Sequence, residues 1–363
     1  MLENQSIDSK QQIVKKVRDS NFELLRCITM LWITFYHLNC HGFRILSSES
    51  SFDFNNLIIK GVSSFQGVSN LIFLMISGYF LVNVKFCWKK VFKLWFQCLF
   101  FSILLGIPLY LLKVPCIPGD GIALRIIESK DFIKIFFPIL SNNTWFTTYY
   151  LIFYMLSPFI AVIIQNIGKI EHFVLICISV FFGSFLPLFF SPYSFSPLYY
   201  FIMVFFISSF IRKYNPEILN NNKIMCLVLL LSVISYILIY FCLVVFFEGK
   251  GIDKIKGMTR LPMLIIAIAV FCIFKNMKLK YIPFINKISS CTLSVYLLHD
   301  NRFSCFIWET VFKIPSMRYS KLYILYSITC VFVIFTIAVC IELLRKRLIE
   351  KPIMNLYDYI FVK

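Results

Sequence analysis

Charge is scarce in this chain of 363 residues. Only 15% of the residues are charged, and 18 acidic residues stand against 36 basic ones. Soluble domains usually carry about 25% charged residues, so the shortage excludes an ordinary soluble domain. No basic segment is long enough to fold alone in water, and the lysines lie mainly between apolar runs. The net charge of +18 therefore indicates the loops of a membrane protein and no nucleic-acid partner.

Cysteine motifs and a signal peptide are also missing. The 13 cysteines lie mostly inside apolar runs, without CxxC spacing and without clusters of His and Cys. They are expected to be small core residues rather than a disulfide framework, and no metal site is expected. Residues 1–20 are polar and charged, and the apolar segment that follows is too long for a cleavable leader.

Long apolar runs are what the sequence has in abundance. Hydrophobic residues make up 59% of the chain, and the mean hydropathy is +0.80. Runs of about 20 apolar residues are long enough to cross a bilayer as helices. We therefore expect an all-α, polytopic transmembrane bundle with about ten spans. They are predicted near residues 22–40, 62–82, 91–112, 145–164, 172–190, 197–211, 224–247, 260–275, 288–311 and 322–344.

The distribution of Lys and Arg predicts the orientation. If the N-terminus lies inside, cytoplasmic segments hold 21 of these residues and external loops hold 14. Cytoplasmic loops usually carry the excess, so both termini are expected in the cytoplasm of a multi-pass cell-membrane protein. This divides the chain into a cytoplasmic tail (1–20), a ten-helix membrane domain (21–345) and a short basic cytoplasmic tail (346–363).

The first span carries polar residues that share one helix face. Arg26 and His37 are eleven residues apart, or about 1100° of helix, close to three full turns and about 16 Å along the axis. Glu23 falls on the same stripe. Ionisable groups at membrane depth are costly and usually functional. The alternative is that Glu23 and Arg26 form an interfacial pair while His37 bonds a neighbouring helix.

The second span repeats the pattern with milder residues. Its polar positions include Asn70 and Ser77 on one face, and it ends in FLMISGYF. Gly78 permits close approach of the backbone to a neighbour or a ligand. Such a stripe either lines a shared internal cavity or only holds helices together.

Two further clusters carry ionisable groups. Lys89, Lys90 and Lys93 flank the cytoplasmic start of the third span, where they either set the topology or form a cationic mouth for an anionic ligand. Tyr296 and His299 share a face of the ninth span near its external end.

The remaining two histidines are given no role. His41 is expected to be an ordinary interfacial residue, and His172 a solvated or interfacial one.

In this order, these residues resemble the acyltransferase-3 family of integral membrane O-acyltransferases. The Arg-x10-His motif of the family is matched by Arg26 and His37. Its Phe-Phe-x-x-Ser-Gly motif appears as FLMISG, with Leu74 replacing the second Phe, and lysines replace its arginine-rich segment. The late Tyr-x-x-His element is matched by Tyr296 and His299.

The resemblance implies transfer of an acyl group, by default acetyl, from cytoplasmic acetyl-CoA to a hydroxyl of a cell-envelope or exported polysaccharide. His37 would act as general base or as nucleophile, and Glu23 would orient Arg26. The residues expected to bind the donor are Arg26, Lys89, Lys90, Lys93, Ser77 and Gly78. The residues expected on the acceptor side are Tyr296, His299 and Asn70.

Two other classes of function remain open at this stage. A transporter or flippase for lipid-linked glycan would also use intramembrane Arg and His, although the sequence lacks the repeated halves of many transporters. A non-catalytic partner of a polysaccharide synthase is the third reading. The expected partners are the acceptor glycan and the lipid bilayer, and the sequence does not indicate an oligomeric state.

Overall fold

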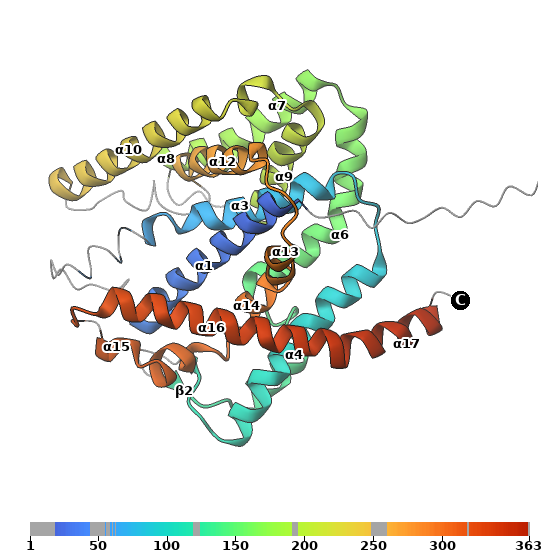
Figure 1. Ribbon diagram of the computed structural model, residues 1–363, viewed down its shortest axis with the longest axis vertical. Coiled ribbons are helices and arrows are strands. Elements are labelled where there is room, and N and C mark those ends of the chain that lie inside the picture. The colour runs from blue at the N-terminus through green and yellow to red at the C-terminus, as the bar shows by residue number, and fades with distance from the viewer. Residues whose placement is uncertain are drawn as a thin grey trace, which may run out of the picture.

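The computed structural model describes residues 19–43, 55, 59, 61, 63–118, 124–190, 195–247, 260–317 and 319–361. Within these ranges the chain is almost entirely helical (Figure 1). Strands β1 (Ile117–Pro118) and β2 (Leu124–Arg125) pair antiparallel over two residues each. The expected all-α class is confirmed.

The longer helices begin and end close to the expected spans. They are α1 (Ser20–Phe43), α3 (Gln66–Leu81), α4 (Trp88–Leu111), α6 (Trp145–Asn166), α7 (Lys169–Val180), α9 (Pro197–Tyr214), α10 (Asn222–Phe246), α12 (Leu261–Asn276) and α16 (Tyr323–Arg345). The shorter ones are α5 (Ser129–Phe136), η1 (Phe181–Phe185), α8 (Leu186–Phe189), η2 (Glu217–Asn220), α13 (Pro283–Ser289), α14 (Thr292–His299), η3 (Ile307–Val311), α15 (Ile314–Met317), η4 (Lys346–Glu350) and α17 (Lys351–Phe361).

Four helices of the described part are long and apolar enough to cross a membrane. They are α4, α6, α10 and the continuous helix Tyr323–Phe361. Helices α3 and α12 are apolar but shorter. These helices make the chain a membrane protein, and the count of about ten spans stays a prediction.

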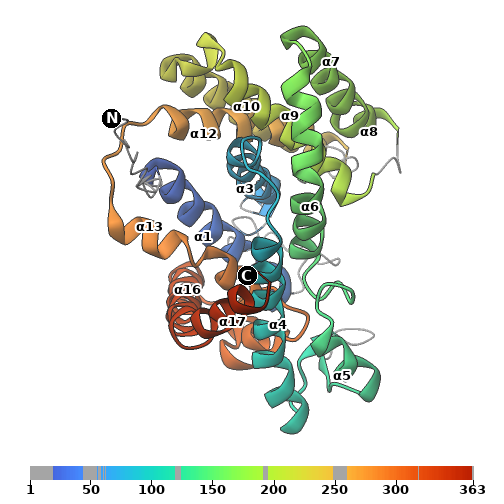
Figure 2. The ribbon, with the colours of Figure 1, turned by 90° about the vertical axis from the view of Figure 1, so that its right-hand side faces the viewer.

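Helix α1 lies at the centre of the bundle and is fixed at both ends (Figures 1 and 2). At its start, the Ser20 hydroxyl donates to Asn286 of α13 at 2.9 Å, and the Asn21 amide donates to the Phe274 carbonyl of α12 at 2.9 Å. Near its other end, the Tyr323 hydroxyl of α16 donates to Asn39. Helix α1 is therefore held by α12 and α13 at its start and by α16 near its end.

The segment expected as one span at 288–311 is broken. Helix α13 ends at Ser289, α14 ends at His299, and residues 300–304 form bends and turns. The eight residues of α14 rise only about 12 Å, well short of a bilayer core of about 30 Å. At the break, the Ser290 hydroxyl bonds the Lys287 carbonyl at 2.7 Å. Hydroxyls that bond nearby carbonyls compete with regular helix.

The expected C-terminal tail continues α16 as helix, through η4 into α17 (Figure 1). This junction buries Arg345, which donates to Glu342 at 2.7 Å and also to Glu350. Tyr357 stacks on Phe92 at the start of α4, with ring centroids 5.2 Å apart. Helix α17 therefore touches the start of α4 through Tyr357, while its last residues, Tyr359, Ile360 and Phe361, are exposed.

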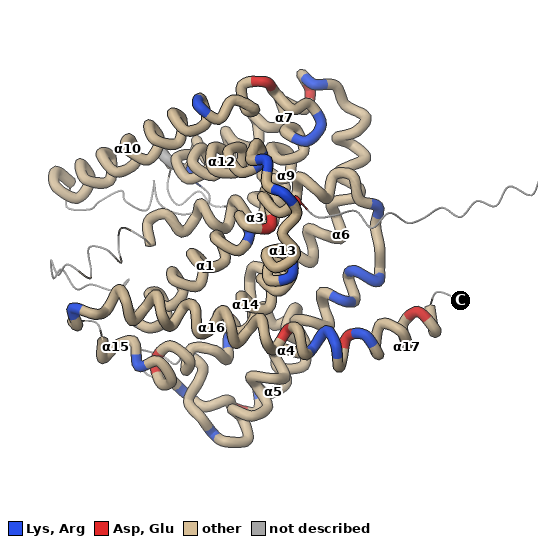
Figure 3. The backbone as a smooth tube through the Cα atoms, in the orientation of Figure 1, with Lys and Arg blue, Asp and Glu red and all other residues tan. Residues whose placement is uncertain are grey.

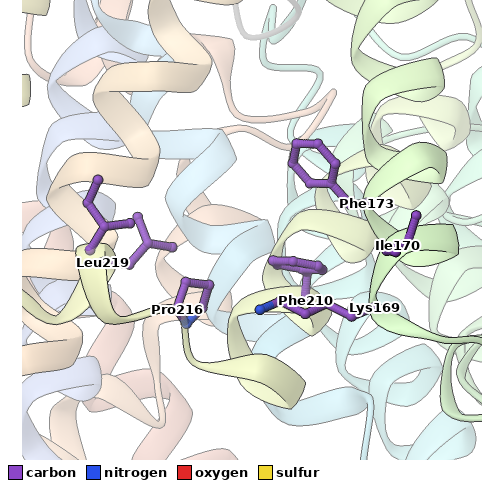
Figure 4. A pocket seen from close by; sticks show the side chains of 7 residues that line it. Lys169, Ile170, Phe173, Phe210, Pro216 and Leu219 are labelled. Carbon is purple, nitrogen blue, oxygen red and sulfur yellow. The ribbon is translucent and has the colours of Figure 1, made fainter.

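An apolar cleft of about 620 Å³ lies between α7 and the connection that follows α9 (Figure 4). The residues that line it are Lys169, Ile170, Phe173, Phe210, Pro216, Ile218 and Leu219. None of the residues predicted for the functional site belongs to this lining, so the cleft does not locate that site.

Candidate active site

Two histidines from opposite ends of the sequence meet inside the bundle. Nδ1 of His37, on α1, lies 3.0 Å from Nε2 of His299, at the end of α14. Both side chains are buried, and the Tyr296 ring stands 6.1 Å from the His37 ring. The structure thus brings together His37 of the first expected span with Tyr296 and His299 of the ninth.

The hydrogen bonds define which nitrogens carry protons when the rings are neutral. Nδ1 of His299 lies 2.6 Å from the Val295 carbonyl, which can only accept, so this nitrogen carries the proton. Nε2 of His299 is then an acceptor, and Nδ1 of His37 must donate to it. This leaves Nε2 of His37 with a free lone pair. That atom is free to accept a proton or to attack an electrophile.

A carboxylate faces this nitrogen. Asp300 Oδ1 lies 3.7 Å from Nε2 of His37 and accepts a hydrogen bond of 2.9 Å from Nε2 of His41. A proton that arrives on His37 therefore creates an imidazolium next to a negative charge, which stabilises it. Asp300 and His41 become members of the site, although the sequence gave neither of them a role.

The surroundings hold the two rings in place. The Trp308 indole donates to the His299 carbonyl at 3.2 Å and fixes the end of α14. The Tyr296 ring stands beside both histidine rings, with its centroid 6.1 Å from that of His37 and 6.0 Å from that of His299. Asp300 lies close to its buried hydroxyl.

His37, His41 and Asp300 also have the donor set of a metal site. Their ligating atoms all lie within 4.8 Å of one another. Imidazole and carboxylate are ligands of Zn²⁺ and similar ions, so the same atoms that handle the proton are those that would hold such an ion. The expectation of no metal stays a prediction.

The other end of the stripe on α1 carries the arginine. Arg26 lies 3.8 Å from Glu23, over the Phe73 ring at 5.7 Å, and its side chain is 23% exposed. Its buried Nε has no hydrogen-bond partner within the described ranges. Glu23 accepts a hydrogen bond from Ser289 of α13. Glu23 therefore holds one side of the guanidinium and leaves donors for a ligand.

The predicted lysine cluster lies at the start of α4, on the edge of the molecule where Lys and Arg gather around α13 and α17 (Figure 3). Lys89 donates to Asp358 at 2.7 Å and Lys93 pairs with Glu350, whereas Lys90 is exposed. An anionic ligand at this cluster would compete with the carboxylates of the C-terminal helix.

The predicted polar residues of α3 serve mostly as packing in this structure. The Ser77 hydroxyl bonds the Phe73 carbonyl of its own helix at 3.0 Å, and Asn70 is buried. At Gly78 a Cβ would collide with Ser208 of α9. The close approach that Gly78 permits is therefore to a neighbouring helix.

The expectation for His172 is wrong. The ring is fully buried, and its Nε2 bonds the Phe206 carbonyl at 3.0 Å. It connects α7 to α9 and lies apart from the histidine pair. The short connection before it made the residue look solvated, but α7 begins at Lys169 and turns His172 inward.

Asp300 offers a direct test of the proton site. Replacing it by Asn removes the negative charge beside His37 while keeping the shape. We expect the rate of the chemical step to fall by about 10²-fold. His41→Ala should keep much more activity, because His41 carries no full charge when neutral and its hydrogen bond goes to Asp300 rather than to His37. Steady-state rates of both variants at equal protein level check this, and equal losses would contradict it.

The site thus sets an imidazole nitrogen, backed by a carboxylate, inside a bundle of apolar helices and on the same helix as an arginine, an arrangement that suits the transfer of protons or acyl groups. The family comparison agrees. A family model described as an acyltransferase domain, acyltransferase-3, matches residues 19–344. The chain therefore belongs to the acyltransferase-3 family and is a membrane acyltransferase. Comparisons with curated proteins and with solved structures find no match.

Proposed function

We propose that this protein is an O-acetyltransferase of the cell membrane that acylates a hydroxyl of a cell-envelope or exported polysaccharide, with acetyl-CoA as the donor. One observation carries the proposal: Nε2 of His37 has a free lone pair. The His37 ring is held through Nδ1 by His299, and Nε2 faces Asp300. General base catalysis on a hydroxyl needs a nitrogen with a free lone pair, and imidazole suits this role because its pKa in water lies near neutrality.

Nε2 of His37 takes part in the proposed reaction by one of two routes, as base or as nucleophile. Nε2 of His37 takes the proton of the acceptor hydroxyl while the hydroxyl oxygen attacks the thioester carbonyl. The carbon–sulfur bond breaks, and the leaving thiolate takes the proton from His37. In the second route Nε2 attacks the thioester itself and the thiolate leaves. The acceptor oxygen then attacks the acyl-imidazole, the bond between Nε2 and the acyl carbon breaks, and the hydroxyl proton passes to the thiolate. An acyl group that accumulates on His37 when acetyl-CoA is supplied without acceptor, trapped by rapid denaturation near neutral pH because acyl-imidazoles hydrolyse in acid, distinguishes the second route from the first.

Arg26 is the proposed binding residue for the phosphates of the donor. A guanidinium with unused donors suits phosphate, and Arg26 lies about 16 Å along α1 from His37. The long arm of acetyl-CoA would bridge this separation. Lys89 and Lys93 would join Arg26 only if the donor displaces Asp358 and Glu350 from them.

Donor entry at Arg26 requires that end of α1 to face the cytoplasm, with about ten spans and both termini inside. The crowding of basic residues around the start of α4, α13 and α17 supports this orientation (Figure 3). We predict that a reporter fused after residue 363 reads cytoplasmic, and reporters at residues 120 and 253 read external. Paired alkaline phosphatase and green fluorescent protein fusions measure this. An external C-terminus would contradict the path of the donor.

The function is tested with purified protein in lipid nanodiscs, radiolabelled acetyl-CoA and polysaccharide from the producing cell. Label in the polysaccharide that alkali releases as acetate supports O-acetyl transfer. Movement of lipid-linked glycan without use of acetyl-CoA would instead identify a flippase. If neither acetyl-CoA turnover nor glycan movement occurs, the protein is a non-catalytic partner and the proposal fails.

A further inference from the structure

The three residues around the free nitrogen of His37 have a second property, because their lone pairs converge. His37 and His41 are four residues apart on α1, so both rings lie on one face of the helix. Their centroids are 5.4 Å apart, and the ring planes differ by 32°. Two histidines at this spacing on a helix are typical of zinc sites, since both imidazoles reach the same ion.

Asp300 supplies a third donor from the end of α14. Its Oδ1 lies 2.9 Å from Nε2 of His41 and 3.7 Å from Nε2 of His37. The ligating atoms of the three residues all lie within 4.8 Å of one another. In a tetrahedral zinc site with bonds of about 2.0–2.2 Å, ligand atoms are about 3.4 Å apart, so an ion fits here once the side chains adjust by about 1 Å or less.

Hydrogen bonds account for the position of His41 but leave His37 without a partner for its lone pair. Nε2 of His41 donates to Asp300, whereas Nε2 of His37 carries no hydrogen when the ring is neutral. This nitrogen and the carboxylate are then two acceptors that face each other, which is unfavourable unless a cation lies between them. A proton is one such cation. A metal ion is the other, and it would bond to all three residues at once.

The surroundings also match those of a metal site. A histidine ligand usually donates its other ring hydrogen to an acceptor that fixes the ring. Nδ1 of His37 donates in this way to His299, which is itself held by the Val295 carbonyl. The His41 side chain is 31% exposed, whereas those of His37 and Asp300 are 9% and 10% exposed. An ion can therefore enter past His41 and be held deeper in the bundle.

We propose that His37, His41 and Asp300 bind a divalent transition-metal ion of the Zn²⁺ type, and that the bound ion inhibits acyl transfer. Two imidazoles and one carboxylate suit Zn²⁺, whereas Mg²⁺ and Ca²⁺ prefer sites made of oxygen alone. The hydrogen on Nε2 of His41 moves to Nδ1 of the same ring or to water, which frees Nε2 for the ion.

Inhibition follows from the use of one lone pair for two purposes. The ion takes the lone pair of His37 Nε2 that the reaction needs, so transfer stops until the ion leaves. Acyl transfer itself needs no metal. The inhibitory part of the inference rests on the proposed function, whereas the binding of the ion does not.

Binding is measured without acyl transfer, on full-length protein in nanodiscs of neutral lipid. After treatment with a chelator, the protein is titrated with Zn²⁺ in a calorimeter. The wild-type protein should bind one equivalent, and Mg²⁺ at the same ionic strength should not displace it. His41→Ala and Asp300→Asn should each weaken zinc binding by at least about tenfold, since even the loss of an outer partner of a metal ligand costs about 10–100-fold. His172→Gln is the matched control and should bind zinc normally, because this buried imidazole bonds the Phe206 carbonyl instead.

X-ray absorption by zinc bound to the wild-type protein covers the case in which these variants fail to fold. The ligand shell should consist of nitrogen and oxygen at about 2.0–2.2 Å. Sulfur at about 2.3 Å would place the ion on some of the 13 cysteines and would overturn the inference. It would also be overturned if the wild-type protein does not bind zinc, or if His41→Ala and Asp300→Asn both bind it as tightly as the wild type.

Inhibition is measured as the rate of acetyl transfer with Zn²⁺, relative to the zinc-free rate of the same variant. Zinc should stop transfer by the wild-type protein, and a chelator should restore it. His41→Ala should need at least about tenfold more zinc for the same fractional loss. A rise in rate with zinc would overturn the inhibitory role, because the ion would then be a cofactor. If one equivalent of zinc binds while no acetyl transfer occurs with or without it, the proposed function fails and the metal site stands.

Discussion

Replacing His37 by Gln should lower the rate of acyl transfer by about 10²–10⁴-fold, the usual contribution of a general base. If His37 is instead the nucleophile, the rate should be too low to measure. Glutamine keeps a polar side chain near His299 but offers no nitrogen that accepts a proton. The measurement is the initial rate of acetyl transfer by protein in nanodiscs at saturating donor. Near-normal transfer would mean that His37 is a packing residue.

His172→Gln is the matched control for this variant. It replaces another buried histidine, on α7, whose hydrogen bond goes to the Phe206 carbonyl rather than to the catalytic group. Activity should stay within a few-fold of the wild-type value, provided that the protein accumulates in the membrane. A loss as large as that of His37→Gln would show that histidine replacement in this bundle acts through folding.

Replacing Arg26 by Ala should weaken donor binding by about 10- to 100-fold. A hydrogen bond to a charged group contributes about 1.5–3 kcal/mol, and each 1.4 kcal/mol is tenfold in affinity. Arg26→Lys keeps the charge but loses the planar fork of the guanidinium. Its affinity for the donor should therefore lie between those of the wild type and Arg26→Ala. Lys280→Ala removes one exposed cation from the connection between α12 and α13 and should bind the donor normally.

Much of α1 could be predicted from the sequence because its chemistry is local. The periodicity of a helix is sufficient to place Arg26 and His37 on one face, and it requires no knowledge of the partners. The same holds for the apolar helices, whose bounds follow from runs of hydrophobic residues. The family resemblance rested on these local motifs, and the match over residues 19–344 confirms it.

The partners of His37 required tertiary packing. His299 is 262 positions away in the sequence, and Asp300 joins the site only because α14 ends at that point. The adjacent pair His299–Asp300 is a signal in the sequence that could indicate a site. A carboxylate at the end of a predicted helix, however, is equally typical of a solvated residue. The break at Ser290 was hidden because the apolar run around it is long enough for one span.

The pairing of charges also required the fold. The lysines at the start of α4 looked free because their partners, Asp358 and Glu350, lie some 260 residues later in a segment expected to be a tail. Likewise, nothing local indicates that Arg125 and Arg302 share the carboxylate of Asp131. Net charge along a sequence predicts a side of the membrane, but it does not predict which charges compensate one another.

The central claim is that donor binding and acyl transfer occupy opposite ends of α1, and donor affinity tests it most directly. Acetyl-CoA binding is measured by calorimetry on wild-type protein, Arg26→Ala and His37→Gln in the same nanodiscs. We predict that Arg26→Ala loses affinity and His37→Gln keeps it, because His37 lies about three turns away. Loss of affinity in His37→Gln with normal binding by Arg26→Ala would contradict the claim.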